Sequence, residues 1–125
     1  MLILEVGKML YPEALDLFEA LKDGRKIIET RANSTKYWSL NIDQEIWFKS
    51  LATGEILQKK IIKNTRFYQY FGDARRTIAH AYKKEDFQKI MPGVRSLEEV
   101  IKNYFAFPDY EQKVARFGLV VFEVG

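Results

Sequence analysis

Four residues near the start of the chain have the types and spacing of a small charged site. Gly24 is followed by Lys26, Glu29 and Arg31, which together form a G-x-K-x-x-E-x-R pattern. A desolvated lysine beside a carboxylate can donate a proton, or accept one if its pKa is lowered. The same pair beside an arginine can equally anchor a phosphate or the edge of a base. The pattern therefore predicts either acid–base chemistry or the binding of a phosphate-bearing or nucleobase ligand.

The same residues also have a purely structural interpretation. Regular strand alternation places Glu29 and Arg31 on one face with Ile27, and places Lys26 on the other face. A bend after Gly24 would turn Lys26 toward the same side, so that the three charged groups meet at one hollow. Without that bend, the pattern describes an ion-paired strand face, which is common in proteins and contributes little to stability.

The composition limits the chemistry that is open to the chain. Its 125 residues, 47% of them hydrophobic, suit a single domain over residues 1–125 with one core. Cysteine is absent, which excludes disulfides and thiolate nucleophiles, and the single histidine, His80, excludes a multi-histidine metal site. Any Ser-His-Asp triad would depend on that one histidine. We expect no cofactor and no bound metal, so Lys, Arg, Tyr, Asp or Glu must carry any chemistry.

The first apolar run bears on the cellular location of the protein, and the net charge bears on its partners. Residues 1–7 are too few for the apolar region of a signal peptide with its cleavage site, and far too few to span a bilayer. We therefore expect a soluble, cytoplasmic protein without a membrane partner. The formal net charge of +3 permits an anionic partner without requiring one.

Aromatic residues stand beside cations at several places. Lys36 precedes Tyr37 and Trp38, and Arg66 precedes Phe67. Cations hold phosphates and aromatic faces stack bases, so this mixture is typical of a surface for single-stranded RNA. The alternative is that the aromatic residues fill the core while the cations cover the surface. The predicted nucleic-acid contacts are Arg25, Lys26, Arg31, Lys36, Tyr37, Trp38 and Arg66, with Tyr68 or Phe71 as stacking surfaces.

Apolar periodicity in the first half predicts one helix among strands. Residues 2–6 are β-prone, and Pro12 and Glu13 suit the first turn of a helix that Gly24 ends. The period then changes to two, which predicts strands at 25–32, 45–51 and 55–71, with a hairpin turn at residues 53–54.

The second half is predicted to be mainly helical before a final strand. Residues 72–91 indicate one or two short helices that stop before Pro92 and Gly93. Ser96 and Glu99 form a capping box for a helix within 95–107. The closing run, residues 117–124, is apolar and β-branched enough for a buried strand. Short successive strands with tight turns favour an α+β domain with a curled sheet or small barrel over a doubly wound parallel sheet.

The charged pattern, placed between a helix end and a strand, resembles the signature of the activating-signal-cointegrator homology (ASCH) family. Segments 12–26, 61–71 and 110–124 are similar to the first helix and turn, the central strand and the closing strand of that family, so the resemblance covers most of the chain. It implies a small PUA-like mixed β-barrel flanked by helices. Asp43 and Gln44 replace the family's usual Gly-Asp pair, and a different turn is expected there.

The resemblance implies a binding function first and catalysis second. PUA-like domains bind RNA, so the leading expectation is a domain that binds RNA or a nucleotide. The alternative is a small hydrolase that acts on RNA or modified nucleosides, with Lys26 and Glu29 as catalytic residues. A third hypothesis, from a different class, is a scaffold that binds a partner protein through exposed Tyr37 and Trp38.

Two kinds of catalysis are implied by the resemblance. Some ASCH-like proteins are amidohydrolases that act on acetylated cytidine with a Lys, a Thr and a Glu, and others resemble metal-dependent ribonucleases. Lys26 matches the lysine, but Glu29 stands where the threonine belongs, and Thr30 beside it is expected on the opposite strand face. Amide hydrolysis by that mechanism is therefore not expected, while a ribonuclease that uses Lys26 with an acid stays open.

Overall fold

The computed structural model describes residues 1–11 and 15–125, so the predicted helix start at Pro12 and Glu13 lies outside the described residues. None of the helices in this part of the chain is long and apolar enough to cross a bilayer. The elements in chain order are β1 Ile3–Val6, α1 Leu17–Asp23, β2 Ile28–Ala32, η1 Thr35–Tyr37, β3 Glu45–Ser50, β4 Ile56–Lys60, β5 Arg66–Tyr68, α2 Ala74–Lys84, η2 Phe87–Lys89, α3 Leu97–Phe105, α4 Tyr110–Phe117 and β6 Leu119–Glu123.

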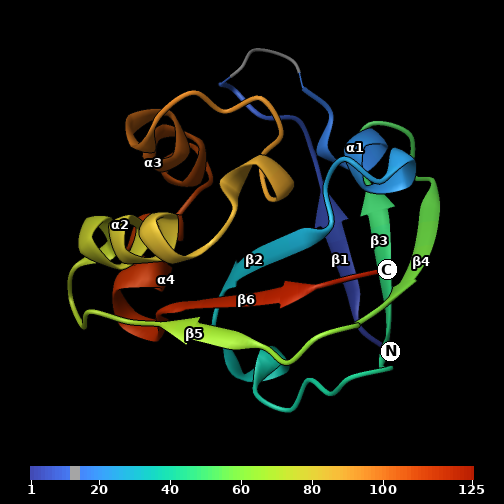
Figure 1. Cartoon of the computed structure of the whole chain (residues 1–125), viewed down its shortest axis with the longest axis horizontal. Helices are drawn as coiled ribbons and strands as arrows, with labels where there is room; N and C mark the ends of the chain where they lie inside the picture. The colour runs from blue at the N-terminus through green and yellow to red at the C-terminus, as the bar shows by residue number, and fades with distance from the viewer. Residues whose placement is uncertain (12–14) are drawn as a thin grey trace.

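The strands form two three-stranded sheets, with the orders β1-β3-β4 and β2-β6-β5 (Figure 1). β3 pairs parallel with β1 and antiparallel with β4, while β6 pairs antiparallel with both β2 and β5. The predicted hairpin is confirmed between β3 and β4, where Gly54 has a φ of 76° that glycine adopts without strain. The domain is therefore a mixed α+β fold, as predicted.

Backbone pairing between described residues joins the two sheets along one side. Where the chain leaves β4, Ile61 forms a β-bridge with Val124, and Lys60 and Gly125 exchange two backbone hydrogen bonds. At the other side, β1 and β2 are the edge strands of their sheets. Among the described residues no backbone pairing links these two edges. The gap between them is where the charged pattern lies.

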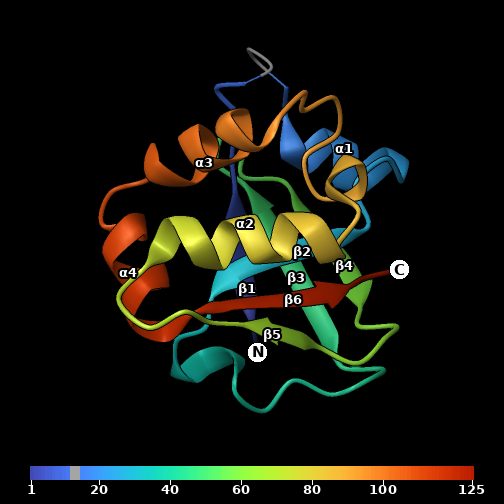
Figure 2. The ribbon, with the colours of Figure 1, turned by 60° about the vertical axis from the view of Figure 1, so that its left-hand side comes forward.

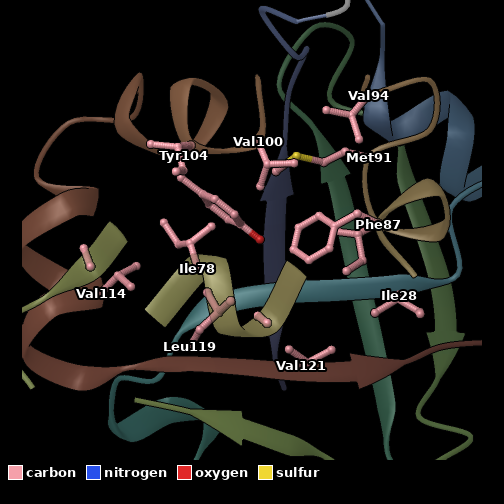
Figure 3. Close-up of a cluster of buried hydrophobic side chains, with 14 of the residues drawn as sticks. Ile28, Ile78, Phe87, Met91, Val94, Val100, Tyr104, Val114, Leu119 and Val121 are labelled. Carbon is pink, nitrogen blue, oxygen red and sulfur yellow. The ribbon is translucent and has the colours of Figure 1, made fainter. Parts of the chain in front are cut away.

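β6 is buried on both faces and separates two apolar cores. Leu119 and Val121 face the core beneath α2, α3 and α4 (Figure 3). Val120 and Phe122 face the core between the two sheets. Figure 2 shows α2 lying over the sheet that contains β6, with α3 and α4 beside it. A strand with both faces covered has no polar face, which explains the continuous apolar run. The predicted closing strand is confirmed.

The prediction of one strand over residues 55–71 is wrong. β4 and β5 belong to different sheets, and the connecting residues 62–65 are exposed. The chain passes from one sheet to the other at Ile61, which is fully buried. Both halves of residues 55–71 are β-prone, so propensity does not place the break between them. The position of the break depends on the strands with which each half pairs.

The helices match the prediction in part. The Ser96 hydroxyl accepts a hydrogen bond from the Glu99 amide at 3.2 Å and begins α3 as predicted. The helices expected within 72–91 are α2 and the short η2. The prediction misses α4, because it assigns residues 110–117 to the closing strand segment. Tyr110 and Val114 in α4 repeat at helical spacing, and Val114 is buried in the core below the helices.

Candidate functional site

The turn at Gly24 determines the position of Lys26. Gly24 ends α1 in the left-handed region with a φ of 85°. This turn lets the Lys26 amide donate back to the Ala20 carbonyl at 3.0 Å, and β2 begins only at Ile28. Lys26 therefore precedes the strand, and strand alternation does not dictate the direction of its side chain. The bend that the pattern requires is present.

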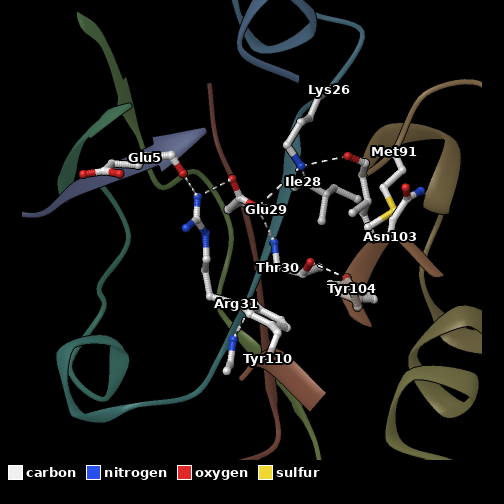
Figure 4. A network of polar contacts seen from close by, with 12 residues as sticks. Glu5, Lys26, Ile28, Glu29, Thr30, Arg31, Met91, Asn103, Tyr104 and Tyr110 are labelled. Atoms are coloured by element: carbon white, nitrogen blue, oxygen red, sulfur yellow. Dashed lines mark hydrogen bonds and ion pairs between the residues drawn. The ribbon is translucent and has the colours of Figure 1, made fainter. Parts of the chain in front are cut away.

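Lys26, Glu29 and Arg31 meet in one charged cluster (Figure 4). Lys26 Nζ lies 3.5 Å from Glu29 Oε1, and Arg31 Nη2 lies 3.5 Å from Glu29 Oε2. Lys26 and Glu29 are only 2% and 5% exposed, while the Arg31 side chain is 22% exposed. The predicted convergence of the three charged groups is therefore present, and it is mostly buried.

The same cluster caps the free edge of β2. Lys26 Nζ donates to the carbonyl of Ile28 at 2.7 Å and to that of Ile90 at 2.8 Å. Glu29 Oε1 accepts a hydrogen bond from the Thr30 amide at 2.9 Å. Buried backbone groups need hydrogen-bond partners, and these two side chains supply them where no neighbouring strand does.

Two further hydrogen bonds link this edge to neighbouring elements. Arg31 Nη2 donates to the Glu5 carbonyl on β1 at 2.9 Å, and the Ala32 amide donates to the Tyr110 hydroxyl on α4 at 2.9 Å. Figure 4 shows the Glu5 carboxylate directed away from the cluster, so Glu5 contributes its backbone. Side chains thus bridge β2 to both β1 and α4.

Burial and charge together set the protonation of the cluster. Burial lowers the pKa of Lys26, and this effect outweighs the nearby Glu29 carboxylate, which raises it. Burial alone would raise the pKa of Glu29, but Lys26 and Arg31 hold it below its ordinary value. For Arg31, the Glu29 carboxylate and nearby tyrosines overcome burial, and the pKa is raised. Two cations thus share one carboxylate, and the charge of Lys26 is the least favoured.

A cavity of about 250 Å³ opens at this cluster, between the edges of β1 and β2. Lys26, Glu29 and Arg31 form its charged lining. Tyr104 and Tyr110 form an aromatic wall, with ring centroids 5.8 Å apart and ring planes within 10° of parallel.

The rim of this cavity includes Phe107, from the segment between α3 and α4. Its ring centroid lies 5.9 Å from that of Tyr110, and the side chain is 42% exposed. Burial raises the pKa of Tyr110, so its hydroxyl remains protonated at neutral pH. The cavity therefore combines fixed charges, a hydroxyl and flat apolar walls.

Thr30 lines the same cavity although it lies on the other face of β2 from Glu29. Across β6, Glu29 is opposite Phe122 and Thr30 is opposite Val121, two residues that belong to different cores. The predicted strand face is confirmed, and Thr30 nevertheless belongs to the lining of the cavity. The cavity wraps around an edge strand, so both faces contribute to it. The Thr30 hydroxyl is hydrogen-bonded to the Tyr104 hydroxyl.

Four of the predicted contacts lie outside the cavity lining, namely Arg25, Lys36, Tyr37 and Trp38. Arg25 is ion-paired with Asp23 at 2.8 Å on the surface. Tyr37 is 5% exposed within the core between the sheets, so its ring is not open to a stacking ligand. Lys36 Nζ lies 5.3 Å from the centroid of that ring. Trp38 is 66% exposed, and its indole donates to a neighbouring backbone carbonyl.

Arg66 and Tyr68, which the sequence predicts as RNA contacts, are bound to Glu85. Arg66 Nε donates to Glu85 Oε2 at 3.0 Å, and the Tyr68 hydroxyl donates to the same carboxylate. Phe71 is 82% exposed and also lies outside the cavity lining. Of the predicted nucleic-acid contacts, the two cations of the G-x-K-x-x-E-x-R pattern are the ones that line the cavity.

The Asp43-Gln44 pair forms a turn away from the cavity. Asp43 has a φ of 69°, in the left-handed region that aspartate tolerates better than most residues. Its amide donates to the Ile61 carbonyl at 2.7 Å, and the Gln44 side chain accepts from the Asn41 amide at 3.1 Å. Asp43 and Gln44 therefore make no contact with the charged cluster in these hydrogen bonds.

The aromatic wall is not predicted by the sequence. Tyr104 is expected on the core-facing side of its helix, and that pattern predicts burial but not a cavity. Phe107 and Tyr110 follow in the segment whose helical spacing the prediction misses. The helical repeat in residues 110–117 is the one signal that would have placed Tyr110 on a buried helix face.

Two solved structures have this fold over nearly their whole length. The crystal structure of hypothetical protein PH0355 is 28% identical in sequence with a TM-score of 0.69, and the match covers 98% of this chain and 97% of that one. The solution structure of protein PF0455 from Pyrococcus furiosus is 26% identical with a TM-score of 0.60, over 98% and 96% of the two chains. No family model matches the chain, and no curated protein is significantly similar. This chain is therefore similar in fold to two proteins whose names state no activity.

Proposed function

We propose that this chain is an ASCH-like domain that binds RNA or a nucleotide, and that the cavity receives one nucleobase. The observation that carries the proposal is the buried cluster of Lys26, Glu29 and Arg31 in the lining of an aromatic-walled cavity. A few fixed polar groups within mostly apolar walls are typical of small-ligand sites.

The arrangement of the sheets supports the PUA-like barrel in this proposal. The two sheets enclose a common core with residues from β1, β3 and β6, and the Ile61–Val124 bridge joins them on one side. The charged pattern lies at the other side, where the strand edges are apart. An opening into a strand-enclosed core is a frequent location for ligand sites.

The size of the cavity favours a single base over a larger ligand. Its volume of about 250 Å³ is just below the roughly 300–1,000 Å³ of clefts that hold drug-sized molecules. An unstacked base is flat, and proteins that recognise single-stranded RNA stack such bases on aromatic side chains. Phe107 and Tyr110 offer faces of this kind at the rim and wall.

The charged cluster offers a hydrogen-bond acceptor beside a donor. The Glu29 carboxylate can accept from a base N–H, and the Arg31 guanidinium can donate to a base carbonyl or ring nitrogen. The hydrogen bonds that Arg31 donates to Glu5 and Glu29 both use Nη2, and we assign its remaining N–H groups to the ligand. Lys26 already donates to two carbonyls and contacts Glu29, so we assign it to positioning the carboxylate.

Titration of the four ribonucleosides and of short single-stranded RNAs tests this proposal. The wild-type chain should bind at least one nucleoside, and Glu29→Gln should weaken that binding about tenfold, because a charge-assisted hydrogen bond is lost. Phe107→Ala should also weaken it, through the lost stacking face. The matched control is Phe71→Ala, an exposed aromatic residue outside the cavity, which should keep the wild-type affinity. Absence of binding, or equal losses in the two phenylalanine variants, would overturn the proposal.

Short RNAs provide a second test through their salt dependence. Phosphate contacts release counterions, so the affinity of the wild-type chain should fall steeply as salt is raised. Nucleoside binding, which involves no phosphate, should change little. RNA affinity that ignored added salt would contradict a phosphate contribution.

Hydrolysis of RNA or modified nucleosides is a second candidate function, and the position of Thr30 favours it. Thr30 lines the same cavity as Lys26 and Glu29. Burial lowers the pKa of Lys26, which increases the share of neutral amine that is able to accept a proton. Product formation from a panel of modified nucleosides and RNAs tests this function, and Thr30→Val should abolish turnover while the protein stays folded. No product from the wild-type chain, or unchanged turnover in Thr30→Val, would contradict it.

A further inference from the structure

A second cavity of about 260 Å³ adjoins the first. The two share Val6, Gly7 and Leu51 in their linings, so they meet at the end of β1 beside the tip of the β3–β4 hairpin. Lys8 and Asp16 are the two charged residues among those that line the second cavity. A ligand seated in the first cavity can therefore extend past Gly7 into the second.

Gly7 stands at the junction of the two cavities. A Cβ atom at this position would lie 3.2 Å from Leu51 Cδ1, which is closer than ordinary van der Waals contact. Any side chain at residue 7 would therefore narrow the passage or push Leu51 aside. With glycine, the backbone can approach a ligand that crosses between the cavities.

The two charged residues at the second cavity differ in their contacts: Asp16 has hydrogen-bond partners within α1, whereas Lys8 forms no ion pair among the described residues. The Asp16 carboxylate accepts hydrogen bonds from the Phe18 amide at 2.9 Å and the Glu19 amide at 3.4 Å, which caps α1. Lys8 is exposed, and no ion pair in the described part of the chain involves it. A compact ammonium beside a cavity is suited to a phosphate, which it binds as a point charge.

We propose that the second cavity is a phosphate subsite, with Lys8 as its cation, and that the ligand of the cleft is a nucleotide and not a free nucleoside. This proposal rests on the function proposed above. It adds the class of ligand and the orientation of that ligand across the two cavities. The base occupies the cavity at Glu29 and Arg31, the ribose crosses Gly7, and the phosphate reaches Lys8.

The spacing between Glu5 in β1 and Lys8, two residues past the end of that strand, is consistent with this direction. Arg31 is held by the Glu5 carbonyl, and Lys8 follows three residues later, about 10 Å along an extended chain. One nucleotide has a comparable extent between the edge of its base and its phosphate. In this arrangement the phosphate lies outside the first cavity and within the second.

The test compares each ribonucleoside with its 5′- and 3′-monophosphates by calorimetric titration, with inorganic phosphate as a further probe. The quantity of interest is the phosphate gain, defined as the dissociation constant of the nucleoside divided by that of its monophosphate. In the wild-type chain the gain should be about tenfold or more for one of the two isomers, as expected for one charge-assisted contact.

Three lysine variants test whether Lys8 is the source of the phosphate gain. In Lys8→Ala the gain should fall to about one, and in Lys8→Glu the monophosphate should bind more weakly than the nucleoside, because the new carboxylate repels it. The matched control is Lys83→Ala, an exposed lysine on α2, which should keep the wild-type gain. Both lysines are exposed, so neither substitution removes a core contact.

The outcomes separate this proposal from the function on which it rests. If nucleosides bind but the wild-type gain is about one, or if Lys8→Ala keeps the gain, the phosphate subsite is overturned while base binding stands. If nucleosides and monophosphates both fail to bind, both proposals are overturned. If inorganic phosphate alone binds as tightly as the monophosphates, the cleft is a simple anion site and the nucleotide assignment is wrong.

Discussion

The Tyr110 hydroxyl accepts a hydrogen bond from the Ala32 amide at 2.9 Å and fixes the start of α4 to the free edge of β2. The Tyr110 ring stacks on Tyr104 and forms a wall of the charged cavity. One side chain therefore holds a helix, satisfies a strand edge and shapes the candidate site. α4, which the sequence analysis missed, therefore forms part of the cavity wall through Tyr110.

Removal of this hydroxyl should destabilise the domain. In Tyr110→Phe the Ala32 amide loses its partner in a partly buried place, and the free energy of unfolding should fall by about 1–3 kcal/mol. Urea denaturation measures the change. The control is Tyr82→Phe, a half-buried tyrosine whose hydroxyl makes no hydrogen bond within the described residues. Equal losses in the two variants would show that the Ala32 contact is unimportant.

Lys26→Met should be among the most destabilising single changes in the cleft. It leaves Glu29 and two carbonyls without their buried cation, and breaking a buried pair in this way costs about 3–5 kcal/mol. The double variant Lys26→Met/Glu29→Gln should recover part of the loss, since the unpaired carboxylate is also removed. Lys22→Met, which breaks the exposed pair with Glu55, should change stability far less. A loss no larger than that of Lys22→Met would contradict the assigned role.

Stability on the acid side should depend on Glu29. Its pKa in the folded chain lies below the ordinary value of 4.5, so its contribution is present above that pH and is lost as the pH falls through the folded pKa. The difference in unfolding free energy between the wild-type chain and Glu29→Gln should therefore shrink below about pH 4.5. Denaturation curves over the acid range measure it. A difference that stays constant with pH would contradict the lowered pKa.

Lys26 should have an effect of its own on the alkaline side. Its folded pKa lies below the ordinary value of 10.5, so between the two values the unfolded chain binds more protons and stability rises with pH. The wild-type chain should therefore gain stability relative to Lys26→Met/Glu29→Gln as the pH rises toward 10.5. Denaturation at intervals across the alkaline range measures the gain. A relative loss would show that the ion pair with Glu29 outweighs the burial of the amine.

Gly118, between α4 and β6, should tolerate no side chain. Its φ is 77°, and a Cβ atom there would lie 2.7 Å from the Phe67 ring and 2.7 Å from the Tyr68 carbonyl. Gly118→Ala should therefore destabilise the domain through both backbone strain and a clash. Gly24→Ala is the matched comparison, because its φ is 85° but a Cβ atom added there would have nothing within 4 Å, and it should cost only about 1–2 kcal/mol. Thermal unfolding compares the two, and equal costs would rule out the clash.

Several features could be predicted because they depend on neighbouring residues. The Gly24 turn, the Ser96 cap and the Gly54 hairpin each involve residues a few positions apart, and backbone preference decides them. Lys26, Glu29 and Arg31 also lie close together in the sequence, but their meeting needs a bend that the pattern left open and that the structure shows.

Other features depend on partners that are distant in sequence. The break after Ile61 occurs because two sheets compete for one β-prone segment, and residue propensity is the same on either side of the break. For a similar reason, three of the predicted RNA contacts lie outside the cavity lining: Tyr37, Arg66 and Tyr68. One is buried between the sheets, and the other two are bound to Glu85 on a different edge of the fold.

By itself, the sequence determined the α+β class and the turn at Gly24, because short-range backbone preference decides these, and it left open whether Lys26 turns toward Glu29 and Arg31. Only the tertiary structure decided that this cluster lies in a cavity. The cavity exists because the edges of β1 and β2 remain apart and residues 104–110 pack against them. Contacts between residues so far apart in the chain depend on how the whole core packs, and no local pattern encodes them.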